Sequence, residues 1–341
     1  MRCIFIFLFL TGYGAISSFA QTAAPNVQEL VAKYLKRTEE YSAAFKNLSA
    51  EETKYIENYE SDGTLKNHRT IVSELLVYQP TKSEIAPAEY RSVRSVDGKP
   101  LPDAEKRALK MFEDIGKAKS VRDEWDRVFK EWSKYDLNQA WWGFTINQGI
   151  ALKASLPYFV FGLLGQEQIA GRKTDVVFYR QVAPSPNYTG PTYLVNDIRK
   201  FDAYRNYPVL FIGKLWLDAE TQQLHREERV MVIYVPTEKL GYTTQGQLRE
   251  ILMSGRASDL LVLTPARWQF TYQASEFGIL MPKTIEINLF NHFYQPKNTA
   301  EIGTGLGLPE LRLGHRTRYT YGAFKRFDVS ADESKREIIK P

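Results

Sequence analysis

The first periodic stretch of the chain has the spacing of an amphipathic helix. Apolar residues recur three and four positions apart from Val27 to Phe45, and charged side chains fill most of the positions between them. Asn26 stands where a helix N-cap is expected, and Glu29 follows three residues later, which is the capping-box arrangement. The pattern predicts a leading helix with one apolar face packed against other parts of the protein.

From about Glu52 the hydrophobic period changes to two, which is the period of β-strands. A first strand is followed by the turn Ser61-Asp62-Gly63 and a returning strand at 68–79. Further strand pairs are predicted at 158–165 with 174–182, at 209–217 with 223–235, and at 267–276 with 283–294, before a last strand at about 315–329. This succession of hairpins is typical of an antiparallel sheet.

A charged stretch at about 103–135 interrupts the strands after the turn Val96-Asp97-Gly98-Lys99-Pro100. One helical face of this stretch carries its large apolar side chains, Val121, Trp125, Val128, Phe129 and Trp132. We therefore expect a helical insertion in the sheet.

The chain shows no repeat of fixed period and no long linker rich in proline, glycine or serine. We expect one domain over residues 21–330, of the mainly β (α+β) class: a curved antiparallel sheet or half-barrel with an N-terminal amphipathic helix and the helical insertion. The aromatic content of 13% suits strands. Residues 331–341 are expected to form a charged tail.

Residues 1–20 have the features of a secretory signal peptide. Arg2 precedes the apolar run Ile4–Leu10, and Ser18-Phe19-Ala20 places small residues at the positions that a signal peptidase reads. We predict cleavage after Ala20 and a periplasmic or secreted protein. The single cysteine, Cys3, would leave with this segment, which excludes disulfides, thiolate metal sites and a cysteine nucleophile. No later stretch has the length of a transmembrane segment.

Charge and motifs point away from several function classes. The formal net charge of +5 is spread along the chain without a basic run, so nucleic acid is not an expected partner. None of the four histidines, His68, His225, His292 and His315, has a second ligand at a metal-binding spacing. His225 and Glu227 would share a strand face, but the alternating charges around them favour ion pairing over acid-base catalysis.

Serine acyl transfer and nucleotide binding also lack their motifs. No G-x-S-x-G or S-x-x-K sequence occurs, and the loop Gly303-Thr304-Gly305-Leu306-Gly307 lacks the following lysine of a phosphate-binding loop. We therefore assign no catalytic residue, no cofactor and no metal ligand. An enzyme would require residues such as His225, Glu227, Glu228, Asp202 and Asp218 to converge in one pocket.

The strands carry apolar and aromatic side chains at alternate positions. Trp268, Phe270 and Tyr272 share one face of a predicted strand, and residues 71–78 and 159–161 are apolar on both faces. Two explanations remain open. Helices and further protein cover both faces, or a curved sheet keeps an apolar concave face for a ligand.

The order of these features resembles the lipoprotein-carrier superfamily, which includes LolA, LolB and related outer-membrane lipoprotein-sorting proteins. The motifs that carry the resemblance are Gly165-x-Glu167 with Gly171-Arg172 and 175–178, Gly213-x-Leu215-Trp216-Leu217-Asp218 with Thr221 and Arg226, Pro282-Lys283, and Tyr319-x-Tyr321-x-x-Phe324-x-x-Phe327. The resemblance implies a half-open antiparallel barrel around helices, whose apolar concavity holds acyl chains without catalysis. The chain is longer than these carriers, chiefly through 103–135, 183–199 and 240–263, and it resembles uncharacterised secreted members.

Three functional hypotheses follow. The first is an exported protein that binds an acyl chain, lipid or lipoprotein, with Trp268, Phe270 and Tyr272 as the ligand-binding residues and the two helical segments as covers. The second is a structural or interaction module of the cell envelope, whose core is filled by its own helices and which docks a protein partner. The third, a hydrolase, has the least support.

Overall fold

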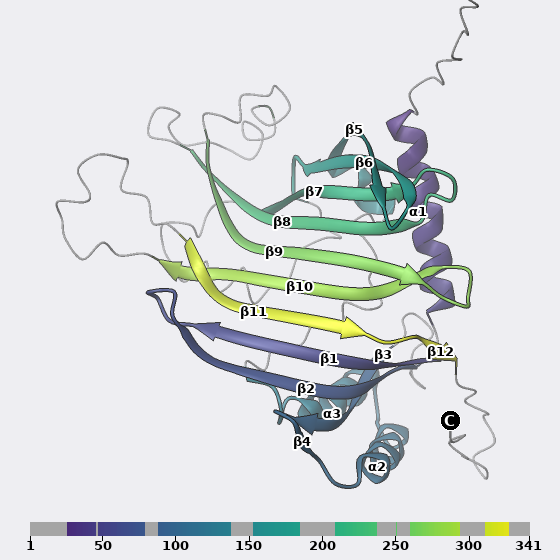
Figure 1. Cartoon of the computed structure of the whole chain (residues 1–341), viewed down its shortest axis with the longest axis vertical. Helices are drawn as coiled ribbons and strands as arrows, with labels where there is room; N and C mark the ends of the chain where they lie inside the picture. The colour runs from purple at the N-terminus through teal and green to yellow at the C-terminus, as the bar shows by residue number, and fades with distance from the viewer. Residues whose placement is uncertain are drawn as a thin grey trace, which may run out of the picture.

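The computed structural model describes residues 26–45, 47–78, 88–137, 153–184, 209–236, 250, 260–293 and 311–326. Their strands form one antiparallel sheet in the order β4-β3-β2-β1-β11-β10-β9-β8-β7-β6-β5, with β12 paired to β1 (Figure 1). The sheet is curved and is not closed, since β4 and β5 lie at its two ends. The expected mainly β class with a curved antiparallel sheet is therefore confirmed.

The elements have the following bounds. The helices are α1 (Val27–Ala44), α2 (Ala104–Gly116), α3 (Val121–Trp132) and the short 3₁₀ helix η1 (Lys153–Tyr158). The strands are β1 (Leu48–Tyr59), β2 (Leu65–Tyr78), β3 (Ala88–Val96), β4 (Lys99–Pro100), β5 (Phe159–Ile169), β6 (Arg172–Gln181), β7 (Val209–Asp218), β8 (Leu224–Pro236), β9 (Leu260–Ala274), β10 (Leu280–Phe293), β11 (Leu311–Tyr321) and β12 (Lys325–Arg326).

Helix α1 lies across one face of the sheet, near the ends of strands β5 to β10 (Figure 1). We call this face the inner face. The apolar residues of α1 are buried in one core with residues of the sheet, as the helical spacing predicted: Leu30, Val31, Tyr34, Leu35, Tyr41 and Phe45. Asn26 caps the helix by accepting a hydrogen bond from the backbone N–H of Gln28 (3.0 Å). Glu29 pairs with Lys33 (2.7 Å), so the carboxylate expected to complete the capping box serves an i,i+4 ion pair.

The helical insertion consists of two helices, α2 and α3, and it packs on the opposite, outer face of β2 and β3. Phe112 of α2 lies edge-on to Tyr78 and Tyr90, with 5.7 Å between ring centroids in each pair. Leu76 and Tyr78 alternate with Leu75 and Val77 of the inner face, which fixes the side on which α2 lies. The expectation that this insertion covers the concavity is therefore wrong. Its amphipathic pattern showed that it packs, but not on which face.

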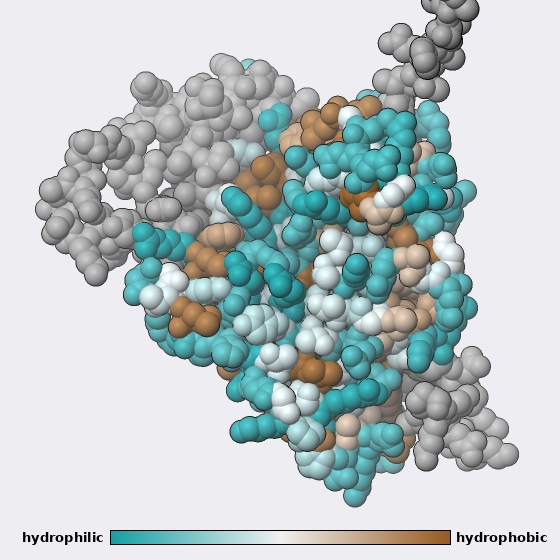
Figure 2. Space-filling model, in the orientation of Figure 1, coloured by the Kyte–Doolittle hydropathy of each residue, from teal (hydrophilic) through white to brown (hydrophobic). Residues whose placement is uncertain are grey.

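The outer face of the sheet is mostly hydrophilic where Figure 2 shows it. Arg318 and Glu286, for example, form an ion pair across β11 and β10 (2.7 Å). A separate apolar cluster on β6 to β8 includes Leu210 and Val232, which are both fully buried. Together with the contacts of α2, this cluster confirms that several strands bury apolar side chains on both faces.

Two turns have the backbone that their sequences predict. Asp97 and Gly98 both adopt positive φ angles (51° and 74°) in the two-residue turn between β3 and β4, and Gly63 has φ 90° in the turn between β1 and β2. Strand β3 was not predicted from the sequence. The expected signal segment 1–20 with its cleavage after Ala20, the loop 303–307 and the tail 331–341 lie outside the described residues. Among the described helices, none combines the length and the apolar character that a membrane span requires.

Candidate ligand-binding site

The three aromatic residues proposed from the sequence lie side by side on the inner face of β9. Trp268, Phe270 and Tyr272 are 4%, 2% and 8% exposed. They belong to the same buried core as the apolar face of α1. The Phe211 ring of β7 packs against Trp268 with 6.1 Å between centroids. In this conformation, therefore, the aromatic face of β9 is covered.

A buried acid lies next to these aromatic rings. Glu227 of β8 is fully buried, and its Oε1 accepts hydrogen bonds from the hydroxyl of Tyr179 (3.0 Å) and from Nε of Arg229 (2.8 Å). The Arg229 guanidinium also lies 5.1 Å from the centroid of the Phe270 ring. Burial, followed by the charge of Glu227, raises the pKa of Tyr272 well above its ordinary value. The inner face is thus apolar with a fixed polar group in it, an arrangement typical of amphiphile sites.

Tyr179 reaches Glu227 because the residue between them has no side chain. Tyr179 lies on β6 and Glu227 on β8, and Gly213 of β7 pairs with Tyr179. A Cβ added at Gly213 would lie 2.0 Å from the backbone oxygen of Glu228 and 2.5 Å from Cζ and the hydroxyl of Tyr179. Glycine at this position, part of the motif quoted above, is therefore required by a close approach of neighbouring strands and by the passage of the tyrosine ring.

A second buried charge cluster, which the sequence did not predict, lies on the inner faces of β1 and β3. Nε of Arg91 donates to Oε1 of Glu52 (2.7 Å), and Nη2 donates to Oε2 of Glu89 (2.8 Å). Burial lowers the pKa of Arg91, but the two carboxylates outweigh it and raise that pKa well above the ordinary value. Beside them, Lys54 is paired with Asp136, which follows α3.

The sequence held one signal for this cluster. Glu52 and Lys54 occupy positions in phase with the buried apolar residues Leu48, Ala50 and Ile56 of β1, so their side chains point inward. Charged residues on an inward phase are rare unless they are paired.

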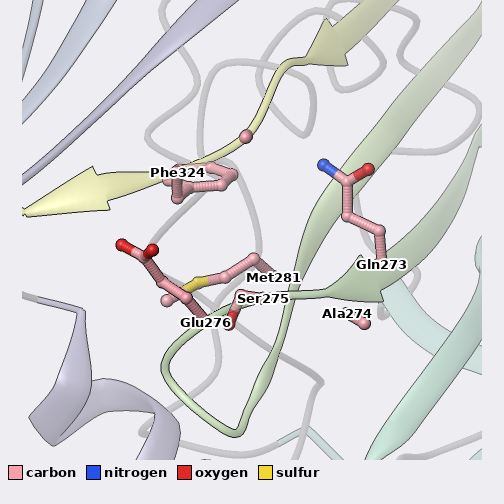
Figure 3. Close-up of a pocket in the computed structure, with 7 residues that line it drawn as sticks. Gln273, Ala274, Ser275, Glu276, Met281 and Phe324 are labelled. Atoms are coloured by element: carbon pink, nitrogen blue, oxygen red, sulfur yellow. The ribbon is translucent and has the colours of Figure 1, made fainter. Parts of the chain in front are cut away.

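A cavity of about 250 Å³ opens at the rim of the inner face, next to the turn between β9 and β10 (Figure 3). Its lining consists of Gln273, Ala274, Ser275, Glu276, Met281, Ala323 and Phe324. Met281 and Phe324 also belong to the main core. The Phe324 ring lies 5.7 Å from that of Phe45, just after α1, and 5.9 Å from that of Tyr321. The apolar wall of the cavity is therefore continuous with the buried inner face.

The residues considered for catalysis do not form one site among the described residues. The β7–β8 ladder shifts register near Trp216, so that His225 contacts Asp218 (3.1 Å) whereas Glu227 lies on the inner face. The expectation that His225 and Glu227 share a face is thus wrong because a bulge separates them. Glu228 pairs with Arg226, and Asp202 lies outside the described residues.

Asp218 stabilises the β7–β8 turn. Its carboxylate accepts hydrogen bonds from Nε of Arg172 (2.9 Å) and from the backbone N–H groups of Glu220 (3.0 Å) and Thr221 (2.9 Å). Partial burial raises the pKa of Asp218, but these hydrogen bonds and the one with His225 outweigh it and hold that pKa well below the ordinary value. Such a permanently ionised, fully engaged carboxylate serves structure rather than proton transfer. Within the described part of the chain, no group of three or more potential ligands is placed to hold a metal ion.

Other motif residues meet at the neighbouring strand ends. Nε1 of Trp216 donates to Oε2 of Glu167 (2.8 Å), and the Arg226 guanidinium stacks 4.6 Å from the Trp216 ring centroid. These contacts join β5, β7 and β8. These residues of the motif therefore make contacts that hold neighbouring strands together.

No protein-family model matches the chain, and no curated protein sequence matches it. Solved structures similar to it include a domain from Vibrio parahaemolyticus named for outer-membrane lipoprotein sorting (11% identity, TM-score 0.34, 90% of this chain and 94% of that chain). Others are a DUF1329 family protein from Desulfovibrio piger (11%, 0.29, 89% and 95%) and a LolA superfamily protein from Nitrosomonas europaea (10%, 0.29, 90% and 96%). The resemblance expected from the sequence is thus found among solved structures, and at these TM-scores it carries no argument about the ligand.

Proposed function

We propose that the chain is an exported, non-catalytic periplasmic protein that binds the acyl chains of a lipid or lipoprotein against the inner face of its sheet. The observation that carries the proposal is the cavity at the rim, whose wall at Met281 and Phe324 continues into the buried aromatic face. Trp268, Phe270 and Tyr272 would contact the acyl chains, because flat rigid side chains supply a large apolar area at low entropic cost.

Binding at this face requires α1 to move. The helix contacts the inner face through aliphatic and aromatic side chains, and acyl chains can replace such contacts because hydrophobic association has little directionality. At the surface, Nε of Arg37 donates to the backbone oxygen of Thr221 (2.9 Å), a bond that water can replace. We therefore assign α1 the role of a cover that is displaced when the ligand enters from the rim.

A filled core is the competing function, and one observation favours it. The aromatic residues of β9 are almost completely buried by other side chains of the same core. If α1 never leaves the inner face, the protein is an interaction module of the envelope that docks a protein partner.

A charged residue introduced on the inner face tests the ligand site. The mature chain is purified without detergent, incubated with phospholipid vesicles and examined by native mass spectrometry, followed by organic extraction of any adduct. We expect a stoichiometric lipid adduct in the parent protein and its loss in Phe270→Asp. Thr271→Asp is the matched control, because Thr271 lies on the outer face of the same strand and is half-buried. Equal amounts of lipid adduct in both variants would refute the assignment of the ligand site to the inner face of β9.

Tethering α1 separates the carrier from the filled-core module. A chain that begins at Gln21 contains no cysteine, so Arg37→Cys and Thr221→Cys can be joined by a short cleavable bismaleimide across a contact that the native side chain already spans. We expect the tethered protein to lose lipid uptake and to recover it after cleavage, whereas the single-cysteine variants treated alike keep it. Unchanged uptake in the tethered protein would refute the role of α1. A parent protein without any adduct would favour the interaction module.

A further inference from the structure

Glu52 and Arg91 form a buried ion pair in which each side chain has one polar atom without a hydrogen-bond partner among the described residues. The side chains of Glu52 and Arg91 are 1% and 6% exposed. Glu52 uses Oε1 for Arg91, and its Oε2 has no hydrogen-bond partner among the described residues. Nη1 of Arg91 has none there either. Two side chains that are hydrogen-bonded to each other thus carry one unsatisfied acceptor and one unsatisfied donor among the described residues.

Such a pair is costly to keep for stability alone. Buried polar atoms in native proteins nearly always have partners, and a buried ion pair can often be replaced by apolar residues without loss of stability. A pair that nevertheless retains one open acceptor and one open donor is suited to a ligand that brings the complementary groups side by side.

The pair lies one aromatic layer from the cavity. Glu52 pairs with Tyr321 across β1 and β11, and Tyr321 packs on Phe324, which lines the cavity. Phe324 belongs to the short segment 322–324 between β11 and β12, which has no regular secondary structure. Connecting the cavity with the charged pair would require the rings of both Tyr321 and Phe324 to move.

We propose that Glu52 and Arg91 form a headgroup subsite for an amphiphile that carries a primary ammonium next to a phosphate, as phosphatidylethanolamine does. The ammonium would donate to Oε2 of Glu52, and a phosphate oxygen would accept from Nη1 of Arg91. A choline head has no N–H to donate, and a glycerol head lacks the cation. The inference rests on the proposed lipid-carrier function and adds the class of lipid.

The test uses the mature chain and vesicles of equal parts phosphatidylethanolamine, phosphatidylcholine and phosphatidylglycerol with identical acyl chains. Lipids bound to the reisolated protein are quantified by mass spectrometry. We expect phosphatidylethanolamine to be enriched about tenfold or more over phosphatidylcholine, as one charge-assisted hydrogen bond allows. Soluble phosphoethanolamine is added in a parallel sample, and binding of this head without binding of the lipid would overturn the assignment to a membrane lipid.

Variants connect the preference to the pair. Glu52→Gln should bring the ratio of the two zwitterionic lipids close to that of the vesicles while total lipid per protein stays similar. Glu74→Gln is the matched control: Glu74 pairs with Arg94 (2.6 Å) on the outer faces of the neighbouring strands β2 and β3 and is half-buried. It should leave the ratio unchanged. Phe324→Ala, which removes one ring from the cavity wall, should speed uptake without changing the preference.

The triple variant Glu52→Met, Glu89→Met and Arg91→Leu separates loss of the headgroup preference from loss of the fold. It removes the charges together, so it should fold with unchanged circular dichroism and bind lipid without headgroup preference. Two results overturn the proposal. Lipid bound by the parent in the vesicle ratio refutes the headgroup subsite alone, because the two open atoms then hold only water. Absence of all lipid from the parent refutes the carrier function as well.

Discussion

Gly213→Ala is the sharpest test of how the inner face is built. The substitution adds one methyl group in the middle of β7, where the neighbouring strand β8 and the Tyr179 ring of β6 come closest. The methyl carbon would lie 2.0 Å from a backbone oxygen, and a paired strand cannot move away as a flexible side chain can. The strain must therefore appear as a shift of β8 or of the tyrosine ring.

The structure sets the size of the effect. Overpacking of a tight site costs about 1–3 kcal/mol. If the Tyr179 ring moves, its hydroxyl loses the hydrogen bond to the buried carboxylate of Glu227 (3.0 Å), which adds about 1.5–3 kcal/mol. We expect a total loss of about 2.5–6 kcal/mol in the free energy of unfolding.

Urea unfolding followed by tryptophan fluorescence measures this loss. With a denaturant slope of about 3 kcal/mol per molar, the midpoint should fall by about 1 M or more. In a Tyr179→Phe background the hydrogen bond is already absent, so Gly213→Ala should then cost only its steric part, about 1–3 kcal/mol. The two substitutions should therefore be less than additive.

Gly162→Ala provides the control. Gly162 lies on β5, outside the left-handed region of φ, and a Cβ there meets nothing within 4 Å, so the free energy of unfolding of Gly162→Ala should stay within about 0.5 kcal/mol of the parent. A Gly213→Ala protein as stable as the Gly162→Ala protein would refute the close approach of β6, β7 and β8 described above.

Two further substitutions probe the buried charges. Burial and a nearby lysine lower the pKa of His315 to about 4, below its ordinary value of 6.5, so the unfolded chain takes up this proton first as the pH falls. The free energy of unfolding therefore has its full value above pH 6.5 and declines by up to about 3 kcal/mol as the pH falls toward 4. His315→Gln should make the urea midpoint less dependent on pH in this range. His68→Gln, at an exposed histidine, should leave the pH dependence unchanged. Arg91→Met leaves the carboxylates of Glu52 and Glu89 buried without their guanidinium, and it should lower the free energy of unfolding by about 3–5 kcal/mol at pH 7. The triple variant Glu52→Met, Glu89→Met and Arg91→Leu should recover most of this loss in the same urea unfolding experiment, whereas an equal loss in both variants would contradict the role of the buried charges.

The sequence predicted those features that depend on neighbours in the chain. The buried face of α1 followed from apolar spacing, and the hairpin turns followed from Asp-Gly pairs that tolerate positive φ. Strand β3 lacks the apolar alternation of a strand, because Glu89 and Arg91 stand at inward positions, where an apolar residue is expected. Glu52, which pairs with Arg91, lies 39 positions from it, and no local pattern connects the two.

The candidate site was predictable only in part. The shared face of Trp268, Phe270 and Tyr272 followed from the strand period, and the structure places them on the inner face, but their role in binding stays a prediction. The side of the sheet on which α2 packs could not be derived from the sequence. Residues 71–78 carry apolar side chains on both faces of the strand, and the period of two does not show which face lies toward the helix. The bulge at His225 has no sequence signal either, and a single extra residue is enough to turn a side chain to the other face.

The pairing of β1 with β11 has a consequence for the order of folding. Strands β1 to β4 form one locally connected meander and β5 to β11 another, and the β1–β11 ladder joins them, with β12 also paired to β1. Its contacts span most of the chain: the side chains of Asn58 and His315, which hydrogen-bond at 2.8 Å, are 257 positions apart. Contacts of such high sequence separation form late because their loop closure costs the most entropy. During folding the two meanders can therefore take shape separately, and the inner face becomes continuous only when β11 pairs with β1.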